Sequence, residues 1–207
     1  MKIQVREYRD SDRNEWMRVH AIILSISHAW NYSIQERPDY DGYESTRIVA
    51  EAIGEPGAQS HIVGLLDTQF DRTPGELCML KDSLGGYVLE FGRLPEYAGH
   101  GIGKLLMDAA AQDALKKGVH RLEYWTQDRK AQRYYRRLEM KEIGRHYRFR
   151  MRATEGVKAL LRADYIGVEY IYGACMPEEW PNIKAKYDII ESHPLEPHLC
   201  VGFEARF

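Results

Sequence analysis

The stretch FGRLPEYAGHGIGK, residues 91–104, is the most informative part of this sequence. It joins a predicted strand, residues 87–91, to an amphipathic helix predicted over residues 102–117. Glycines allow positive φ angles and a close approach of a ligand to the backbone, so successive N–H groups can point to one place. The positive end of the helix dipole adds to this effect. We therefore expect the stretch to bind a phosphate or a pyrophosphate.

Two well-known phosphate-binding loops do not match this stretch. A Walker A loop has the pattern GxxxxGK[ST], but Ala98 stands at its first glycine position and Leu105 at its last position. The dinucleotide-binding pattern GxGxxG fails because Lys104 stands in place of the third glycine. The pattern that remains is GxGxG, residues 99–103, at the start of a helix.

Length and composition limit the class of protein. The chain has 207 residues, of which 44% are hydrophobic, and a formal net charge of -2. A chain of this size buries enough surface to fold without a disulfide or a structural metal, and we expect no metal. The near balance of charge argues against a general nucleic-acid or anionic-membrane binder.

The cysteines and the N-terminus bear on the compartment. Cys78, Cys175 and Cys200 lie far apart and form no CxxC pair, which argues against a disulfide framework or a zinc site. The N-terminus MKIQVRE has no apolar segment typical of a signal peptide, and the apolar run at residues 21–24 is too short to cross a bilayer. We expect a cytoplasmic protein with no membrane contact.

Periodicity predicts alternating strands and helices along the rest of the chain. Asp12 and Glu15 are spaced as a capping box at the start of the first helix, which ends near Ser27. The predicted strands are residues 2–8, 60–69, 77–80, 87–91, 121–126, 141–151, 168–175 and 199–207, and the further helices are residues 46–53, 102–117, 128–138 and 177–187.

A second block, DRKAQRYYRRLEM at residues 128–140, follows the first at a distance of one helix and one strand. Together the two blocks resemble the GNAT superfamily of acetyl-CoA-dependent N-acyltransferases, whose signatures are [RQ]xxGx[GA] and Nxx[A]xx[FY]YxxLGF. The resemblance covers residues 2 to about 152. The departures from the family pattern are Ala98 for Arg or Gln, Asp128 for Asn, Glu139 for Gly and Met140 for Phe.

The resemblance implies an α+β fold with a central mixed, mostly antiparallel sheet flanked by helices. It implies an acetyltransferase core at residues 1–152. Residues 153–207 have too few apolar groups to fold well alone, so we expect a C-terminal extension packed on the core, with a last strand at about 199–207. The extension can also be an insertion whose last strand returns to pair with residues 141–151. It would then lie beside the acceptor site or at a homodimer interface, and the sequence leaves both open.

The resemblance also implies acetyl-CoA as the cosubstrate. In the family, amides of the glycine turn hold the pyrophosphate, and the edge of the preceding strand holds the pantetheine arm. The positions that correspond in this chain are Phe91, Arg93, Leu94, Ala98, Gly99, His100, Gly101, Ile102, Gly103, Lys104, Asp128 and Ala131.

Two residues are expected to move protons. Tyr135 matches the family tyrosine that protonates the departing thiolate, and a phenol of pKa about 10 suits a thiolate of pKa about 8.5. Glu90 is the expected base for the acceptor amine, ahead of His100, which lies within the phosphate turn. The alternative interpretations are a core aromatic for Tyr135 and a solvent-facing carboxylate for Glu90.

Aromatic and acidic residues alternate in residues 30–44, the region that shapes the acceptor site in this family. Aromatic faces beside carboxylates suit a cationic amine, and we expect a primary amine of a small molecule or a peptide. The alternative is a solvated loop anchored by a few aromatics. The candidate acceptor-binding residues are Trp30, Tyr32, Tyr40 and Tyr43.

Three classes of function remain open. The first is an N-acetyltransferase, and the second is an acyl-CoA-binding module or sensor without catalysis, which Ala98 and Asp128 keep open. The third is an interaction protein that uses a basic cluster beginning at Arg129, although a solvated helix face explains that cluster more simply. Part of this cluster can also lie near the 3′-phosphate of coenzyme A.

Overall fold

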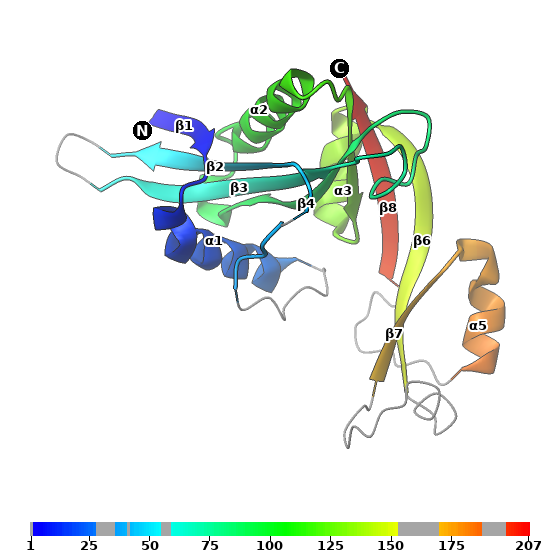
Figure 1. Ribbon diagram of the computed structural model, residues 1–207. Helices are drawn as coiled ribbons and strands as arrows, with labels where there is room; N and C mark the ends of the chain where they lie inside the picture. The colour runs from blue at the N-terminus through cyan, green and yellow to red at the C-terminus, as the bar shows by residue number, and fades with distance from the viewer. Residues whose placement is uncertain (1, 28–35, 41, 55–58, 153–169, 188–197) are drawn as a thin grey trace. The chain divides into compact units, whose positions relative to one another are not determined.

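The computed structural model describes residues 2–27, 36–40, 42–54, 59–152, 170–187 and 198–207 (Figure 1). The chain divides into two compact units. The first contains the chain up to Lys141 together with residues 203–207, and the second contains residues 142–202. The last strand, β8 (His198–Arg206), contributes residues to both units.

A mixed sheet forms the first unit. Its strands lie in chain order, beginning with β1, and residues 203–206 of β8 follow β5. Neighbouring strands from β1 to β4 are antiparallel, and β4 and β5 are parallel. The strands are β1 (Lys2–Glu7), β2 (Ser45–Ile53), β3 (His61–Phe70), β4 (Gly86–Arg93) and β5 (Arg121–Thr126).

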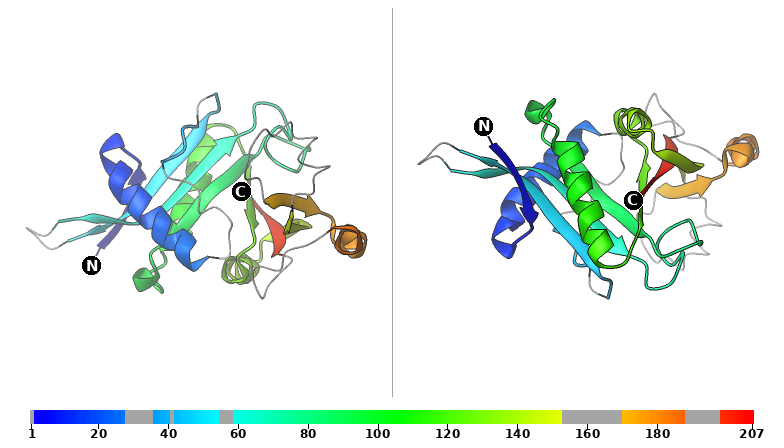
Figure 2. Two further views of the ribbon diagram at one scale, coloured as in Figure 1. Left: turned by 90° about the horizontal axis from the view of Figure 1, so that it is seen from below. Right: turned by 90° about the horizontal axis from the view of Figure 1, so that it is seen from above.

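Two helices cover opposite faces of this sheet, as the views from below and from above show (Figure 2). Helix α1 (Arg13–Ile26) contacts β3 and β4, and helix α2 (Ile102–Lys116) contacts β2 and β3. Because both faces of the central strand β3 are covered, seven consecutive residues, 62–68, are buried. A third helix, α3 (Arg129–Arg137), follows β5, and short 3-10 turns lie at Asp10–Asp12 and Pro95–Tyr97.

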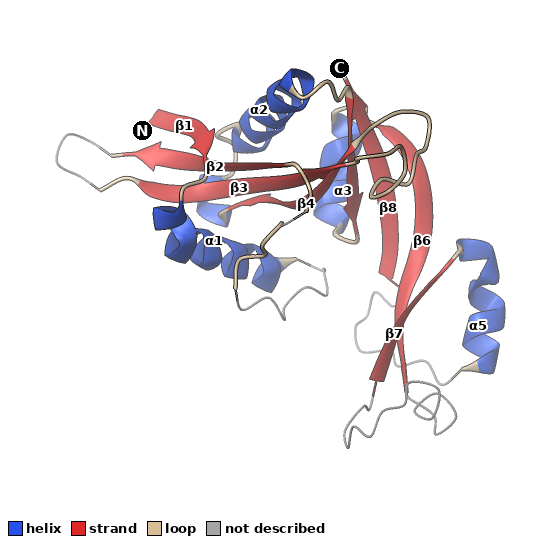
Figure 3. Ribbon diagram, in the orientation of Figure 1, coloured by secondary structure: helices blue, strands red, loops and turns tan. Residues whose placement is uncertain are grey.

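Most predicted elements are confirmed (Figure 3), but residues 46–53 form strand β2 and not a helix. This segment is rich in β-branched residues such as Ile48 and Val49, and it pairs with β1 on one side and β3 on the other. Pairing with a strand on each side therefore determines the conformation of this segment, although its apolar residues are also spaced as in a short helix.

The strand predicted at residues 77–80 is also absent from the described elements. These residues belong to a loop, residues 71–85, in which carboxylate side chains accept hydrogen bonds from the N–H groups of residues 77–80. The Asp71 carboxylate accepts from the N–H groups of Leu77 and Cys78, and the Glu123 carboxylate accepts from those of Met79 and Leu80. With its donors used in this way, the segment cannot join a strand ladder.

The predicted capping box of Asp12 and Glu15 does not form. The Asp12 carboxylate instead accepts hydrogen bonds from the Arg6 guanidinium at 2.7 and 3.0 Å and from the Arg9 N–H at 2.8 Å. Glu15 pairs with Arg18 on the exposed side of α1. Asp12 therefore ties β1 to the start of α1, and the Arg6 hydrogen bond is the main cause that lowers its pKa.

In the second unit, β6 (Lys141–Arg152) pairs antiparallel with β7 (Tyr170–Cys175), and the strand order is β8, β6, β7. Pro177–Glu179 leads into helix α5 (Trp180–Lys186), whose Trp180 ring packs on Tyr147 and Phe149. These elements confirm the predicted strands and helix of the tail. The boundary expected near residue 152 stays a prediction.

Candidate active site

Strand β4 separates from β5 halfway along its length. The pairs between them run from Gly86↔Leu122 to Val88↔Tyr124, but β4 continues to Arg93. On its other side, Thr68 pairs with Val88 and Asp67 pairs with Glu90, so Leu89 is an extra residue in β4. Such a bulge increases the local twist of a strand. The second half of β4 thus presents a backbone edge that β5 does not pair with over the described residues.

The glycine turn follows this edge. Gly99 and Gly101 have φ angles of 82° and 72°, and a side chain at either position would meet no atom within 4 Å. Conformation and not lack of space therefore requires glycine at both positions. Glycine is needed at position 103 for lack of space, since an added Cβ would lie 2.9 Å from the Tyr134 hydroxyl oxygen. It lets α3 approach α2 closely.

The turn is open and its side chains do not block the start of α2. Gly101 is the residue before α2, and residues 102–105, all described, include no acidic side chain. Ala98, His100 and Lys104 are exposed, and the Lys104 ammonium pairs with Asp108 at 2.7 Å. Free N–H groups at a helix start with nearby cations favour an anion.

Tyr135 packs beside the diverging part of β4. Its ring lies 6.3 Å from the Phe91 ring, 5.3 Å from Tyr124 and 5.2 Å from Phe203, measured between centroids. Burial raises the pKa of the Tyr135 phenol well above its ordinary value, and Tyr124 adds to this shift. The hydroxyl therefore stays protonated at neutral pH, as a proton donor requires.

Helix α3 owes its start to Asp128. The Asp128 carboxylate accepts from the N–H groups of Lys130 and Ala131 at 2.5 and 3.3 Å, which caps the helix that carries Tyr135. The basic residues of this helix are exposed, while Gln132 and Tyr135 are buried. The basic cluster on α3 thus lies on the outer face of an amphipathic helix.

Glu90 lies on the α1 side of the sheet and is buried, with 9% of its surface exposed. Its Oε2 atom is 3.0 Å from Nε2 of His20, a residue of α1 that is 2% exposed. The interpretation of Glu90 as a solvent-facing carboxylate is therefore wrong. The register of the sheet places Asp67 directly opposite Glu90 on β3.

Asp67 is fully buried and has two partners. The Arg37 guanidinium donates to its Oδ2 atom at 2.8 Å, and the Tyr40 hydroxyl donates to the same atom at 3.0 Å. Burial raises the pKa of Asp67 to about 6, and the Arg37 charge and the Tyr40 hydrogen bond oppose this shift. Asp67 and Glu90 together make a buried acidic site beneath α1.

A family model for "Acetyltransferase (GNAT) family" matches residues 10–140, which is more than half of the chain. The chain belongs to the GNAT acetyltransferase family. The resemblance found in the sequence is thus confirmed, and with it the α+β fold and an acyltransferase activity as a class. No curated protein matches the sequence at a significant level.

Solved structures show the same fold. The GNAT acetyltransferase from Streptococcus pneumoniae is 13% identical, with 100% of each chain covered and a TM-score of 0.58. Arabidopsis thaliana NAA60 in complex with a bisubstrate analogue is 14% identical, with 99% of this chain and 98% of that chain covered and a TM-score of 0.57. A GCN5-related N-acetyltransferase from Kribbella flavida has a TM-score of 0.53 at 13% identity, with 99% of this chain and 98% of that chain covered.

The four aromatic residues predicted at the acceptor site of this GNAT chain have different surroundings. Tyr40 lies against the acidic site through Asp67. Tyr43 instead donates to Glu76 at 3.0 Å, and the Arg72 guanidinium lies over its ring. Tyr43 therefore packs against the loop of residues 71–85. Trp30 and Tyr32 lie outside the described residues.

Sequence reasoning missed His20, Asp67 and Arg37. The signal for Asp67 was available, because a carboxylate within the apolar run HIVGLLD must be buried when the strand is central. His20 follows Trp16 by four residues on α1, the spacing of side chains on one helix face. No local pattern indicated that Arg37 would reach Asp67 across the fold.

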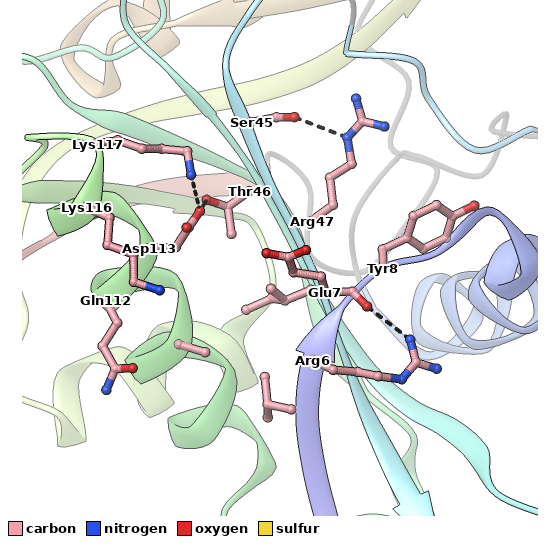
Figure 4. A pocket seen from close by; sticks show the side chains of 13 residues that line it. Arg6, Glu7, Tyr8, Ser45, Thr46, Arg47, Gln112, Asp113, Lys116 and Lys117 are labelled. Carbon is pink, nitrogen blue, oxygen red and sulfur yellow. Dashed lines mark hydrogen bonds and ion pairs between the residues drawn. The ribbon is translucent and has the colours of Figure 1, made fainter.

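A separate pocket of about 400 Å³ lies between β1, β2 and the end of α2 (Figure 4). The Asp113 carboxylate in its wall bonds to the Thr46 hydroxyl and to the Lys117 ammonium, each at 2.5 Å. None of the residues predicted for the active site lines this pocket. It is therefore distinct from the β4 edge and the glycine turn.

The described residues contain neither a candidate metal site nor a candidate membrane-spanning helix. There, no group of three or more His, Cys, Asp or Glu side chains is placed to hold a metal ion. In the same part of the chain, no helix combines the length and the apolar character needed to span a bilayer.

Proposed function

We propose that this protein is an acetyl-CoA-dependent N-acetyltransferase that moves an acetyl group to a primary amine of a small molecule or peptide, by direct transfer in a ternary complex. The observation that carries the proposal is the edge of β4 that β5 leaves unpaired after Val88 and that leads into the glycine turn. This edge and the glycine turn offer two stretches of backbone groups, separated by residues 94–98, whose N–H groups at Leu94, Tyr97 and Ala98 are bonded within the chain.

The residues present fit acetyl-CoA. The N–H groups from Gly99 to Lys104 suit the pyrophosphate, and the backbone of β4 from Phe91 to Arg93 suits the amide-containing pantetheine arm. Arabidopsis NAA60 has been solved with acetyl-CoA and has a similar fold at a TM-score of 0.57, which supports the proposal. When bound, acetyl-CoA supplies an activated acetyl group and a thiolate leaving group.

In this reaction the acceptor nitrogen has to lose two protons and the departing sulfur has to gain one. Glu90 takes one from the acceptor ammonium, directly or through water, so that the amine nitrogen has a free electron pair. Tyr135 gives its phenolic proton to the departing sulfur. The amine nitrogen gains the acetyl group as the carbon–sulfur bond breaks, and its second proton passes, directly or through water, to the Tyr135 phenolate. Glu90 then releases its proton to solvent.

The acceptor approaches from the α1 side of the sheet. Glu90, Asp67 and the Tyr40 ring gather there, and carboxylates beside an aromatic face favour a cation. A protonated primary amine is the acceptor form that this charge attracts. Trp30, Tyr32 and Tyr43 remain proposed contributors to the same acceptor site.

The test is a measurement of thiol release from acetyl-CoA across a panel of small amines, amino-terminal peptides, alcohols and carboxylates. We expect primary amines to accelerate release well above the rate in water, with mass spectrometry showing one added acetyl group on the amine. Acceleration by only neutral or anionic acceptors would overturn the proposal.

Ala98 favours a second candidate, an acyl-CoA-binding module without catalysis, because it removes a side chain that the family pattern supplies at the turn. Calorimetry with acetyl-CoA and the thiol-release panel separate the two candidates. Binding without acceleration by any amine would favour the module.

A further inference from the structure

The Trp16 ring of α1 contacts two other side chains, His20 of the same helix and Arg37 of the segment before β2. The Trp16 ring is fully buried and lies parallel to the His20 ring, with centroids 4.7 Å apart and planes inclined by 13°. The Arg37 guanidinium carbon lies 5.2 Å from the centroid of the Trp16 ring. Trp16 thus contacts both an imidazole and a guanidinium.

Each of these two groups is bonded to a buried carboxylate. Arg37 donates to Asp67 at 2.8 Å, and His20 lies at 3.0 Å from Glu90 through its Nε2 atom. Asp67 and Glu90 occupy facing positions on β3 and β4, so four side-chain contacts and this one strand pair connect the five residues in a ring. The ring connects α1, the segment before β2, and the two strands.

His20 has little freedom to move within this ring. It is 2% exposed, and stacking on Trp16 sets the plane of its imidazole. A neutral imidazole that carries its proton on Nε2 donates to the Glu90 carboxylate, and a buried carboxylate needs such a donor. The direction of this bond therefore sets the orientation of the Glu90 carboxyl group.

We propose that His20 is a positioning residue, which donates from Nε2 to Oε2 of Glu90 and so orients this carboxylate to take a proton from the acceptor amine. This inference rests on the proposed role of Glu90 as the base. Trp16 contributes by holding the imidazole in place, and it touches no reacting atom.

Other charged and titratable groups face the pair and enter any pH profile. Asp67 lies across the strand from Glu90, and Arg47 on β2 lies across from Asp67. Tyr40 and Arg37 both donate to Asp67, and Arg37 also lies 4.1 Å from the Tyr8 ring centroid.

The test compares His20→Leu, which removes the donor, with His20→Gln, which can place an amide donor close to the position of Nε2. His120→Leu is the matched control, because His120 is exposed and lies outside the proposed site. We expect His20→Leu to lower kcat roughly 10- to 100-fold, a part of the total effect of a general base. Acetyl-CoA affinity by calorimetry should stay within about twofold, and His20→Gln should recover most of the rate.

The pH profile of kcat/KM gives a readout that a purely structural role would not change. In His20→Leu its acid limb should move to higher pH, because a buried carboxylate that loses its donor favours the neutral form. In His20→Gln the limb should stay near its wild-type position. An acid limb that does not move in His20→Leu overturns the proposal. If His20→Leu does not fold, the proposal is overturned when the acid limb of His20→Gln leaves its wild-type position.

A double-mutant cycle with Glu90→Gln separates this inference from the proposed function. If His20 acts through Glu90, His20→Leu should have little further effect in a Glu90→Gln background. Equal losses in both backgrounds would overturn the role of His20 and leave the base in place. Full turnover in Glu90→Gln would instead remove the base role itself, and with it the inference.

Discussion

At the scale of single residues, burial sets the chemistry of this site. Tyr135, Asp67 and Glu90 are all buried, but their partners differ. Tyr135 is surrounded by aromatic rings, Asp67 by a guanidinium and a phenol, and Glu90 by an imidazole. The same residue types on a protein surface would titrate with ordinary pKa values.

Replacing Tyr135 with Phe removes the proton donor and keeps the ring that packs on Phe91 and Phe203. We expect kcat to fall by roughly 10²- to 10³-fold, since general acid catalysis contributes on this order. Acetyl-CoA affinity, measured by calorimetry, should change little. Tyr134→Phe is the matched control, and unchanged turnover in Tyr135→Phe would remove the assigned role.

Asp67 should make stability depend on pH. Its folded pKa, about 6, lies above its ordinary value of 3.8, so its contribution to stability is full below about pH 4 and is lost as pH rises to about 6. In urea unfolding, Asp67→Asn should therefore weaken this decline, which is on the order of 3 kcal/mol. The exposed Asp10→Asn serves as control, and equal pH slopes in wild type and Asp67→Asn would contradict the prediction.

At the scale of elements, the bulge at Leu89 and the turn after β4 create the site, and α1 and α2 hold the sheet from both faces. The turn and its helix could be predicted, because their glycines and apolar spacing are local signals. Strand β2 could not, since its conformation comes from pairing with β1 and β3. The loop of residues 71–85 also depends on Glu123, which is distant in sequence from the Met79 and Leu80 N–H groups that it accepts from.

Gly103 tests the contact between α2 and α3. In Gly103→Ala the new Cβ would lie 2.9 Å from the Tyr134 hydroxyl oxygen, which should lower the free energy of unfolding by about 1–2 kcal/mol. Tyr134→Phe removes that oxygen, and Ala is a better helix former than Gly by about 1 kcal/mol. In the Tyr134→Phe background the same substitution should thus be neutral or stabilising. Equal destabilisation in both backgrounds would show that this contact is not the cause.

Asp71 tests the loop of residues 71–85. Its carboxylate accepts from the N–H groups of Leu77, Cys78 and Gly85, and Arg121 lies 3.9 Å away. Asp71→Ala leaves several buried donors without an acceptor and should cost about 3 kcal/mol in urea unfolding. Asp82→Ala, at an exposed position of the same loop, should cost much less. Similar losses in the two variants would contradict this account of the loop.

At the scale of the whole molecule, the family match ends at residue 140, and the second compact unit begins at residue 142. The family match therefore covers most of the first unit, and the site residues stay predictions. In the second unit only the positions of strands and a helix were predictable, from alternation and from Pro177. The buried ring around Trp16 could not be predicted, because it joins residues from four separate parts of the chain.

The three cysteines should not disturb a thiol assay on this protein. All three are free and buried, and burial raises the pKa of each thiol, that of Cys200 to about 11. A thiol-specific reagent should therefore react slowly with the native chain and rapidly with three thiols in urea. Fast reaction of the native chain would show that a cysteine is more accessible than its burial indicates.

The most direct test of the central claim is thiol release from acetyl-CoA in the presence of primary amines, followed with the wild-type chain and with Tyr135→Phe. The account predicts amine-dependent release by the wild type, with a matching amount of N-acetylated product, and a large loss in the variant. Release that no amine accelerates, or that Tyr135→Phe leaves unchanged with the best amine, would contradict it.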